Sequence, residues 1–375
     1  MVCRVHRAHG SRVGAPQTFQ TLKKVSLGGH HAWTRMDTLY FKGSSRLISC
    51  FSMDRNIYLH ENAEQLMSSG VILKDEFDSE RTLLPSLRQV FDDRFSNPLE
   101  TSADRFVWDY WHVPGQYSLM RTPADGFFPA HLYDELESRV LDFGYRELGC
   151  RGISPMWLSY YVHGHRQEFH TDAPHGPLAF VLSLTDFENR KFSGGETMLL
   201  QDHILSFWKH HGSHAIELPD ILNLVPPMFN RMTVFDPRIP HGVRTVEGVS
   251  DPRDGRIVLH GWYTEPSAYF EGDIDENIAT DILNASLGPL YQALGEIPEA
   301  CGIVSVRLEI GLMSGRMDQM CILANTLQFK QQDIDRYETI DTIIEMIYDY
   351  LSDISFASAI KGPSPVEIVI PFLFE

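Results

Sequence analysis

The sequence predicts a mainly β protein: a double-stranded β-helix, or jelly-roll, with flanking helices, followed by a small C-terminal α+β domain. Short β-patterned runs follow one another between residues 155 and 266, and each is bounded by Gly, Pro, Asp or Asn. Helical periodicity precedes these runs, and helices and strands alternate after them. Many short strands with such punctuation are typical of a sandwich or a jelly-roll.

Length, charge and cysteine usage narrow the class of protein. The 375 residues suffice for two or three domains, and no apolar run approaches the ~20 residues that a membrane span needs. The net charge of −18 argues against a nucleic-acid partner. The five cysteines are scattered without metal-type spacing, which favours a reducing compartment. We therefore expect a cytoplasmic protein without a membrane span.

The N-terminal segment, residues 1–50, differs in charge from the rest. Residues 1–46 hold eight Lys or Arg and one acidic residue, Asp37. A segment with so little apolar content predicts a disordered leader. An organellar targeting peptide is the alternative, because such peptides are also rich in Arg and poor in acids.

Residues 51–124 are expected to form a helical and extended support region. Short helices are predicted over 62–77 and 82–95, and an aromatic-rich extended chain over 105–120. An amphipathic helix then opens the domain predicted over residues 125–266, with Leu132, Leu136 and Val140 on one face.

A candidate metal site lies in the stretch "EFHTD". If this stretch is extended, His170 and Asp172 project from the same face of a strand, because side chains alternate along a strand. The stretch "RIPHGV" supplies a second imidazole, His241. Two histidines and one carboxylate form the facial triad that leaves open positions on Fe(II).

A candidate co-substrate anchor follows the predicted triad. Arg256 begins "RIVLHGWYTEP", on the next predicted strand after His241. Its guanidinium could hold a carboxylate through two parallel hydrogen bonds. Arg253 is the alternative guanidinium on the loop before it.

These stretches occur in an order that resembles a family. "YVHGHRQEFHTD", "GGET", "IPHGV" and "RIVLHGW" are similar to the catalytic domain of the prolyl 4-hydroxylase-type Fe(II)/2-oxoglutarate-dependent dioxygenases. The resemblance implies that His170, Asp172 and His241 bind Fe(II), and that Arg256 binds 2-oxoglutarate. It also implies that Tyr161 contacts the same co-substrate carboxylate, with Tyr160 as a competitor for that role.

The resemblance also implies a reaction. We expect hydroxylation of an unactivated carbon with O2 as co-substrate, release of succinate and CO2, and ascorbate as a reductant. Asp172 favours hydroxylation, since related halogenases carry Ala or Gly at this position. The substrate class that the resemblance implies is a peptidyl or free amino acid such as proline. The alternative is a catalytically silent scaffold that acts through its C-terminal domain.

Two further groups of residues receive no role in this chemistry. Gly194 and Gly195 are expected to serve a turn or a bulge. Seven histidines have no fixed spacing and are expected at the surface or in loops: His163, His165, His175, His203, His210, His211 and His214.

Residues 275–375 predict the small α+β domain. A helix over 279–298 leads into two strands within 302–323, and a helix over 337–356 precedes a last strand. The stretches "GIVSVRLEIGLMSGRM" and "GPSPVEIVIPFLF" resemble the C-terminal domain of TonB-like transducers and gliding-motility proteins. That resemblance implies a docking site for a partner protein, and a stabilising appendage is the alternative.

Overall fold

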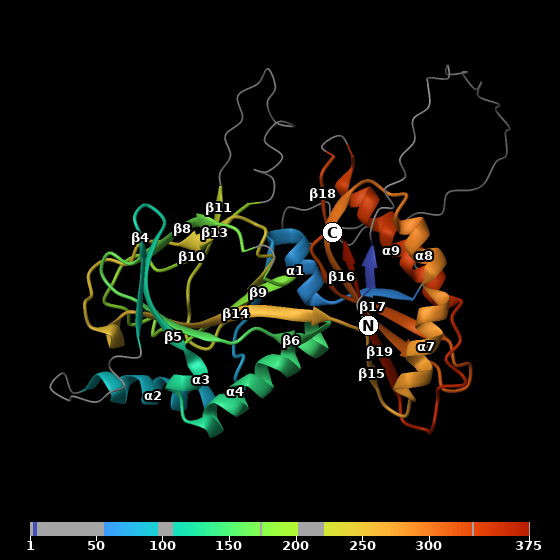
Figure 1. Cartoon of the computed structure of the whole chain (residues 1–375), viewed down its shortest axis with the longest axis horizontal. Helices are drawn as coiled ribbons and strands as arrows, with labels where there is room; N and C mark the ends of the chain where they lie inside the picture. Colours follow the sequence, from blue (N-terminus) through green and yellow to red (C-terminus); the bar gives the residue numbers. More distant parts are fainter. Residues whose placement is uncertain are drawn as a thin grey trace, which may run out of the picture.

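Two β-sheets with flanking helices build the protein (Figure 1). No helix in the part of the chain that the computed structural model describes is long and apolar enough to cross a membrane. The described stretches are residues 3–5, 56–96, 108–172, 175–201, 221–331 and 334–374.

The larger sheet has twelve strands and forms the jelly-roll. Its main path runs β11-β10-β13-β8-β5-β7-β14-β9-β12-β3, with β4 beside β5 and β6 beside β14. The strands are β3 (Val71–Lys74), β4 (Asp109–Val113), β5 (Tyr117–Pro123), β6 (Cys150–Ile153), β7 (Trp157–Tyr161), β8 (Arg166–His170), β9 (Leu178–Ser183), β10 (Thr197–Leu200), β11 (Leu222–Val225), β12 (Met232–Phe235), β13 (His241–Val243) and β14 (Arg256–Pro266).

Two antiparallel groups within this sheet give the jelly-roll its two halves. β8, β13, β10 and β11 form one group, and β7, β14, β9 and β12 form the other. The apolar alternation in the sequence made these strands predictable, because one face of each strand packs into a core. The predicted jelly-roll with flanking helices is confirmed.

Helices cover the outer face of this sheet. Leu84, Phe91 and Leu136 are fully buried there against strand residues such as Leu259. The helices are α1 (Glu61–Ser69), α2 (Leu83–Ser96), α3 (Ala124–Phe127), α4 (Ala130–Phe143) and the π-helix η2 (Gly144–Leu148).

The helix predicted over 62–77 is wrong in its second half. Helix α1 ends at Ser69, and Gly70 follows in the left-handed conformation with φ of 70°. A glycine in this conformation ends a helix. The residues after it form β3, which pairs with β12 and so extends the jelly-roll sheet.

The smaller sheet, here called the C-terminal sheet, follows the order β1-β19-β16-β17-β2, with β15 beside β19 and β18 beside β16. Helices α7, α8 and α9 pack against it through a continuous apolar core. The elements are β1 (Cys3–Val5), β2 (Ile57–Leu59), β15 (Tyr269–Glu271), α7 (Glu276–Ser286), α8 (Gly288–Leu294), β16 (Ala300–Ile310), β17 (Met317–Asn325), β18 (Gln328–Phe329), α9 (Arg336–Ser352) and β19 (Val366–Phe374).

The predicted domain limits stay predictions, but the pairing of the N-terminal strands differs from expectation. β1 lies within the expected leader and pairs in parallel with β19. β2 lies in the expected support region and pairs in parallel with β17. The leader's remaining residues lie outside the described stretches.

The two sheets share part of one core. Ile303 and Ala324 of the C-terminal sheet belong to the apolar cluster beneath the jelly-roll helices. Arg307 on β16 donates a hydrogen bond to the carbonyl oxygen of Arg146 in η2. The C-terminal sheet therefore packs directly on the jelly-roll (Figure 1).

Candidate metal and co-substrate site

The three predicted metal ligands lie together. His170 ends β8, Asp172 follows two residues later, and His241 begins β13, where it pairs directly with His170. Nε2 of His170 lies 3.4 Å from Oδ1 of Asp172, and Nε2 of His241 lies 3.3 Å from Oδ2 of the same carboxylate. One ligand atom from each residue falls within 4.8 Å of the others. Antiparallel pairing of β8 with β13 thus assembles a site from residues far apart in sequence.

Backbone carbonyls set the tautomer of both imidazoles. Nδ1 of His170 lies 3.0 Å from the carbonyl oxygen of Glu168, and Nδ1 of His241 lies 2.9 Å from that of Ile239. A carbonyl only accepts, so each Nδ1 carries the proton and each neutral ring keeps a lone pair on Nε2. The Nε2 amide group of Gln167, a donor, lies 3.1 Å from Nε2 of His170. Both histidines therefore present the nitrogen that binds a metal.

The electrostatics of the triad suit a cation. Burial opposes ionisation of Asp172, but in their protonated forms both imidazoles donate to this carboxylate, which outweighs burial and holds its pKa well below the usual value. Burial likewise opposes protonation of His170, and the hydrogen bond with Asp172 outweighs it and raises the pKa of that imidazole. A divalent metal between the three residues would take the place of the imidazole protons and compensate the same carboxylate charge.

Arg256 lies in the same cavity as the triad. It begins β14, is only 1% exposed, and donates from Nη2 to Oγ1 of Thr197 at 3.2 Å. Its guanidinium carbon lies 4.7 Å from the ring centre of Tyr161. Its Nε is buried, and no described residue accepts a hydrogen bond from it. Burial lowers the pKa of Arg256 because the charge is desolvated. A buried cation with an unused donor fits a carboxylate ligand.

The structure separates the two competing tyrosines. Tyr161 lines the cavity, and Arg256 lies directly opposite it on β14. Tyr160 points to the other face of β7, where its ring packs 4.7 Å from Trp108 and 6.2 Å from Phe91. Only Tyr161 is placed to reach a ligand of Arg256.

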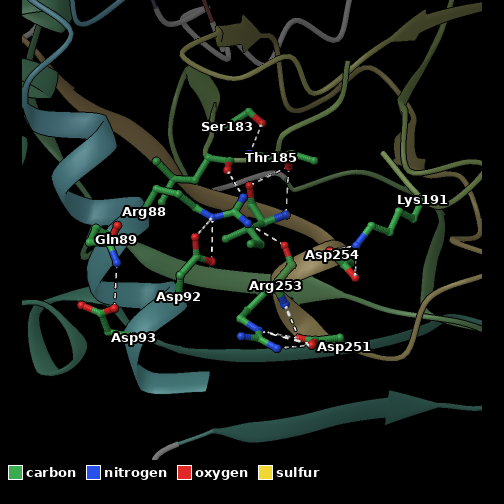
Figure 2. Close-up of polar contacts among 12 residues, drawn as sticks. Arg88, Gln89, Asp92, Asp93, Ser183, Thr185, Lys191, Asp251, Arg253 and Asp254 are labelled. Atoms are coloured by element: carbon green, nitrogen blue, oxygen red, sulfur yellow. Dashed lines mark hydrogen bonds and ion pairs between the residues drawn. The ribbon is translucent and has the colours of Figure 1, made fainter. Parts of the chain in front are cut away.

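The alternative arginine, Arg253, points away from the cavity. Figure 2 shows its guanidinium turned toward Asp251, with Nη2 2.7 Å from Oδ2 of that carboxylate. Its backbone carbonyl accepts a hydrogen bond from Arg88 on α2, which also donates to the carbonyl oxygen of Leu184. This network fixes the loop before β14, and Arg253 does not line the cavity.

Three further polar residues line or support this site and received no role from the sequence. Thr197 holds Arg256, Gln167 contacts His170, and His260 lies on β14 with its Nε2 2.8 Å from Oγ of Ser159. All three border the cavity of about 60 Å³ that the triad and Arg256 share. The alternation of side chains along β14 could have predicted that His260 faces the cavity, because it lies four residues after Arg256 and so on the same face of the strand.

The two glycines of "GGET" serve a turn, as predicted. Gly194 and Gly195 have φ of 79° and 81°. A side chain at Gly194 would collide with the carbonyl oxygen of Thr245 at 1.8 Å. The turn places Thr197 where its hydroxyl oxygen accepts the hydrogen bond from Arg256.

The remaining histidines do not form a second metal site among the described residues. His163 is exposed, and His165 packs near Tyr110. His175 stacks on Trp262 with ring centres 4.6 Å apart, at the edge of the cavity. The others lie outside the described stretches: His203, His210, His211 and His214.

Comparison with known proteins gives one family similarity for the jelly-roll. Residues 156–264 match the model of the 2OG-Fe(II) oxygenase superfamily. A comparison with curated proteins returned no match.

Solved structures were compared with the chain as well. They include a Pseudomonas putida prolyl-4-hydroxylase (15% identity, TM-score 0.36, covering 54% of this chain and 97% of that one). Another is a Trichoplax adhaerens prolyl hydroxylase in complex with a hypoxia inducible factor peptide fragment (17% identity, TM-score 0.36, covering 54% of this chain and 86% of that one). A third is the α-ketoglutarate-dependent epimerase SnoN from nogalamycin biosynthesis (15% identity, TM-score 0.38, covering 56% of this chain and 84% of that one).

The matched segment contains all three predicted metal ligands and Arg256. The family implies Fe(II) as cofactor and 2-oxoglutarate and O2 as co-substrates, and His170, Asp172 and His241 could bind the iron. Residues 156–264 are therefore similar to a 2OG-Fe(II) oxygenase domain, and this match supports an oxidoreductase of the dioxygenase class.

Proposed function

We propose that the protein hydroxylates an unactivated carbon of a peptidyl or free amino acid. The observation that carries this proposal is one cavity bordered by an intact His170–Asp172–His241 triad and by a buried arginine with an unused donor. When bound there, Fe(II) and 2-oxoglutarate would supply, together with O2, an oxidation in which one oxygen atom enters a C–H bond and the other enters the succinate that is released with CO2.

Each residue has a definite task in this proposal. His170, Asp172 and His241 hold the metal from one side and leave its other side open. Hydrogen bonds from Nδ1 to the backbone keep both imidazoles oriented. Arg256 binds the distal carboxylate of 2-oxoglutarate, and the hydroxyl of Tyr161 adds a hydrogen bond to the same group.

The cavity walls favour a protected reaction. Val181, Phe235 and Val258 line it together with Trp262, so apolar side chains surround the polar groups. Such walls limit water near the metal and keep side reactions down. Asp172 occupies the position where a smaller residue would admit a halide, so the triad supports hydroxylation.

The substrate class rests on the motif resemblance alone. "GGET", "IPHGV" and the spacing of six residues between Arg256 and Trp262 are features that the chain shares with prolyl 4-hydroxylase-type enzymes. A scaffold without catalysis is disfavoured, because it would not need an intact triad beside a buried arginine.

The test is succinate formation by the purified full-length chain. The assay contains Fe(II), ascorbate, O2 and 2-oxoglutarate, with and without pooled proline-containing peptides and amino acids. We expect succinate that requires iron, rises with one of the pools and is lost in His241→Ala. Absence of succinate, together with absence of Fe(II)-dependent binding of 2-oxoglutarate, would overturn the proposal.

A further inference from the structure

A second guanidinium faces the interior of the jelly-roll. Arg121 lies on β5 directly opposite Ser159 on β7, and Oγ of Ser159 contacts His260 of the cavity. Residues directly opposite one another on paired strands project from the same face. Arg121 therefore lies on the cavity side of the sheet, and two strand spacings, about 10 Å, separate β5 from β14.

Two indole rings hold this guanidinium. Its central carbon lies 3.1 Å from the ring centre of Trp111 on β4 and 4.0 Å from that of Trp157 on β7. Cation–π contacts engage the flat faces of a guanidinium and leave the N–H groups at its edge available. The two tryptophans thus fix the orientation of Arg121 without using its hydrogen-bond donors.

No carboxylate in the described part of the chain forms an ion pair with Arg121, although exposed Asp109 lies directly opposite it on β4. No described residue forms an ion pair or a hydrogen bond with it, and its Nε is buried without a partner. Burial lowers the pKa of this guanidinium, and the charges of Tyr117, of Asp109 directly opposite it on β4, and of Tyr161 oppose that effect only in part.

Other half-buried arginines of the jelly-roll region differ from Arg121. Arg88, Arg139 and Arg231 each form an ion pair with an aspartate. Arg256 is also enclosed and has no such ion pair with a described residue, and its cavity already has a ligand assigned by the proposed function. A desolvated donor that the fold leaves unused is costly unless a ligand completes it.

We propose that Arg121 binds a carboxylate of the primary substrate, which makes the substrate an amino acid or peptide with a carboxylate close to the carbon that is hydroxylated. This inference rests on the proposed function and deepens it. A planar guanidinium edge matches the two oxygens of a carboxylate through parallel N–H···O bonds. The α-carboxylate of a free amino acid or chain end, and the side chain of an internal Asp or Glu, offer the same chemistry.

Binding tests this inference without turnover. The purified full-length chain, saturated with 2-oxoglutarate, is titrated calorimetrically with amino acids, dipeptides with free C-termini, peptides with internal Asp or Glu, and the amide counterpart of each. We expect one carboxylate series to bind at least about 10-fold more tightly than its amides. The series that binds distinguishes the two sources. Equal binding of acids and amides, or binding by none of these compounds, would overturn the inference.

Variants separate substrate binding from a purely structural role of the tryptophan–arginine contact. Arg121→Gln should lose the preference for carboxylates, Arg121→Lys should keep part of it, and neither should change the KM for 2-oxoglutarate. Arg253→Gln is the matched control, because that guanidinium is paired with Asp251 outside the cavity. A lower Tm of Arg121→Gln with an unchanged preference would assign the residue to the framework instead.

The two proposals can fail separately. Carboxylate binding that depends on Arg121, without iron-dependent succinate and without Fe(II)-dependent binding of 2-oxoglutarate, would overturn the proposed function and leave Arg121 as a carboxylate-binding residue of unassigned chemistry. Succinate formation that is stimulated equally by acids and amides would support the function and overturn the role of Arg121.

Discussion

The cavity of the jelly-roll and the core under the C-terminal sheet are both enclosed by protein, yet they treat polar groups differently. The core between that sheet and α9 consists of apolar side chains such as Ile343, Ile347 and Phe372, all fully buried. The cavity instead encloses Nε of Arg256 and Nε1 of Trp262, for which no described residue provides a hydrogen-bond partner. Each such group costs about 1–3 kcal/mol.

This contrast indicates which region stabilises the protein and which one binds. An apolar core gains free energy as it stands, since burial removes hydrocarbon from water. Unpaired polar groups are tolerated where a ligand completes them. Variants in the cavity should therefore change ligand binding more than folding, and variants in the core under the C-terminal sheet should do the reverse.

The largest effect is expected at the carboxylate of the triad. Asp172→Ala removes a proposed metal ligand, so iron-dependent succinate formation should fall at least about 100-fold, more than the loss of a residue that only supports a metal ligand costs. The rise in Tm that Fe(II) or Mn(II) produces by binding only the folded state should also disappear. Asp186→Ala, at an exposed aspartate outside the cavity, is the control. Normal activity of Asp172→Ala would remove this residue from the triad.

Arg256→Met should sharpen the contrast, because it weakens binding without weakening the fold. Loss of a charged, two-bond anchor should raise the KM for 2-oxoglutarate about 100-fold. The Tm of the ligand-free protein should stay the same or rise, since a buried charge without a carboxylate partner is replaced by an apolar chain. Steady-state kinetics and thermal unfolding measure the two effects. A lower Tm with an unchanged KM would make Arg256 a structural residue.

The opposite pattern is expected under the C-terminal sheet. Ile347→Ala opens a cavity in a fully buried position of α9, so the free energy of unfolding should fall by about 3 kcal/mol. The KM for 2-oxoglutarate should not change. Thr342→Ala, at an exposed position of the same helix, should have little effect on stability. Urea unfolding gives the free energy of unfolding, and kinetics on the same samples give the KM for 2-oxoglutarate. A raised KM in Ile347→Ala would show that the core under the C-terminal sheet also affects ligand binding.

Much of the candidate site could be predicted from the sequence, because its residues stand in short local patterns. Alternation along an extended "EFHTD" puts His170 and Asp172 on one face, and the structure places them there. The order of the motifs indicated His241 and Arg256. By contrast, Tyr160 and Tyr161 could not be separated, since both belong to one β-patterned run and only the pairing with β14 shows which face meets the cavity.

What the sequence did not reveal depends on pairing between distant strands. β1 and β2 join the C-terminal sheet through parallel pairing with β19 and β17. No local sequence pattern predicts such pairing. The segment 71–74 was assigned to a helix because its apolar run continues the helical period, and the signal that ends α1 is a single glycine. The flanking of Arg121 by two tryptophans from different strands is equally invisible in the sequence.

His260→Gln tests the smallest expected effect, on stability rather than on binding. Burial, together with the charges of Arg121 and Arg256, lowers the pKa of His260 to about 3, so the folded protein keeps this ring neutral. The unfolded chain protonates the same ring near its ordinary pKa of 6.5 and therefore binds more protons as the pH falls below that value. Stability is lost in this direction.

Between pH 7 and pH 5, the wild type should lose about 2 kcal/mol more of its free energy of unfolding than His260→Gln does. His163→Gln, at an exposed histidine, should follow the wild type. Urea unfolding at both pH values gives the comparison. Because the effect arises from an uncharged ring held beside two arginines, equal pH dependence of His260→Gln and the wild type would mean that His260 is protonated in the folded protein. The polar groups of the cavity would then be better compensated than the unpaired atoms indicate, and the contrast with the apolar core would be weaker.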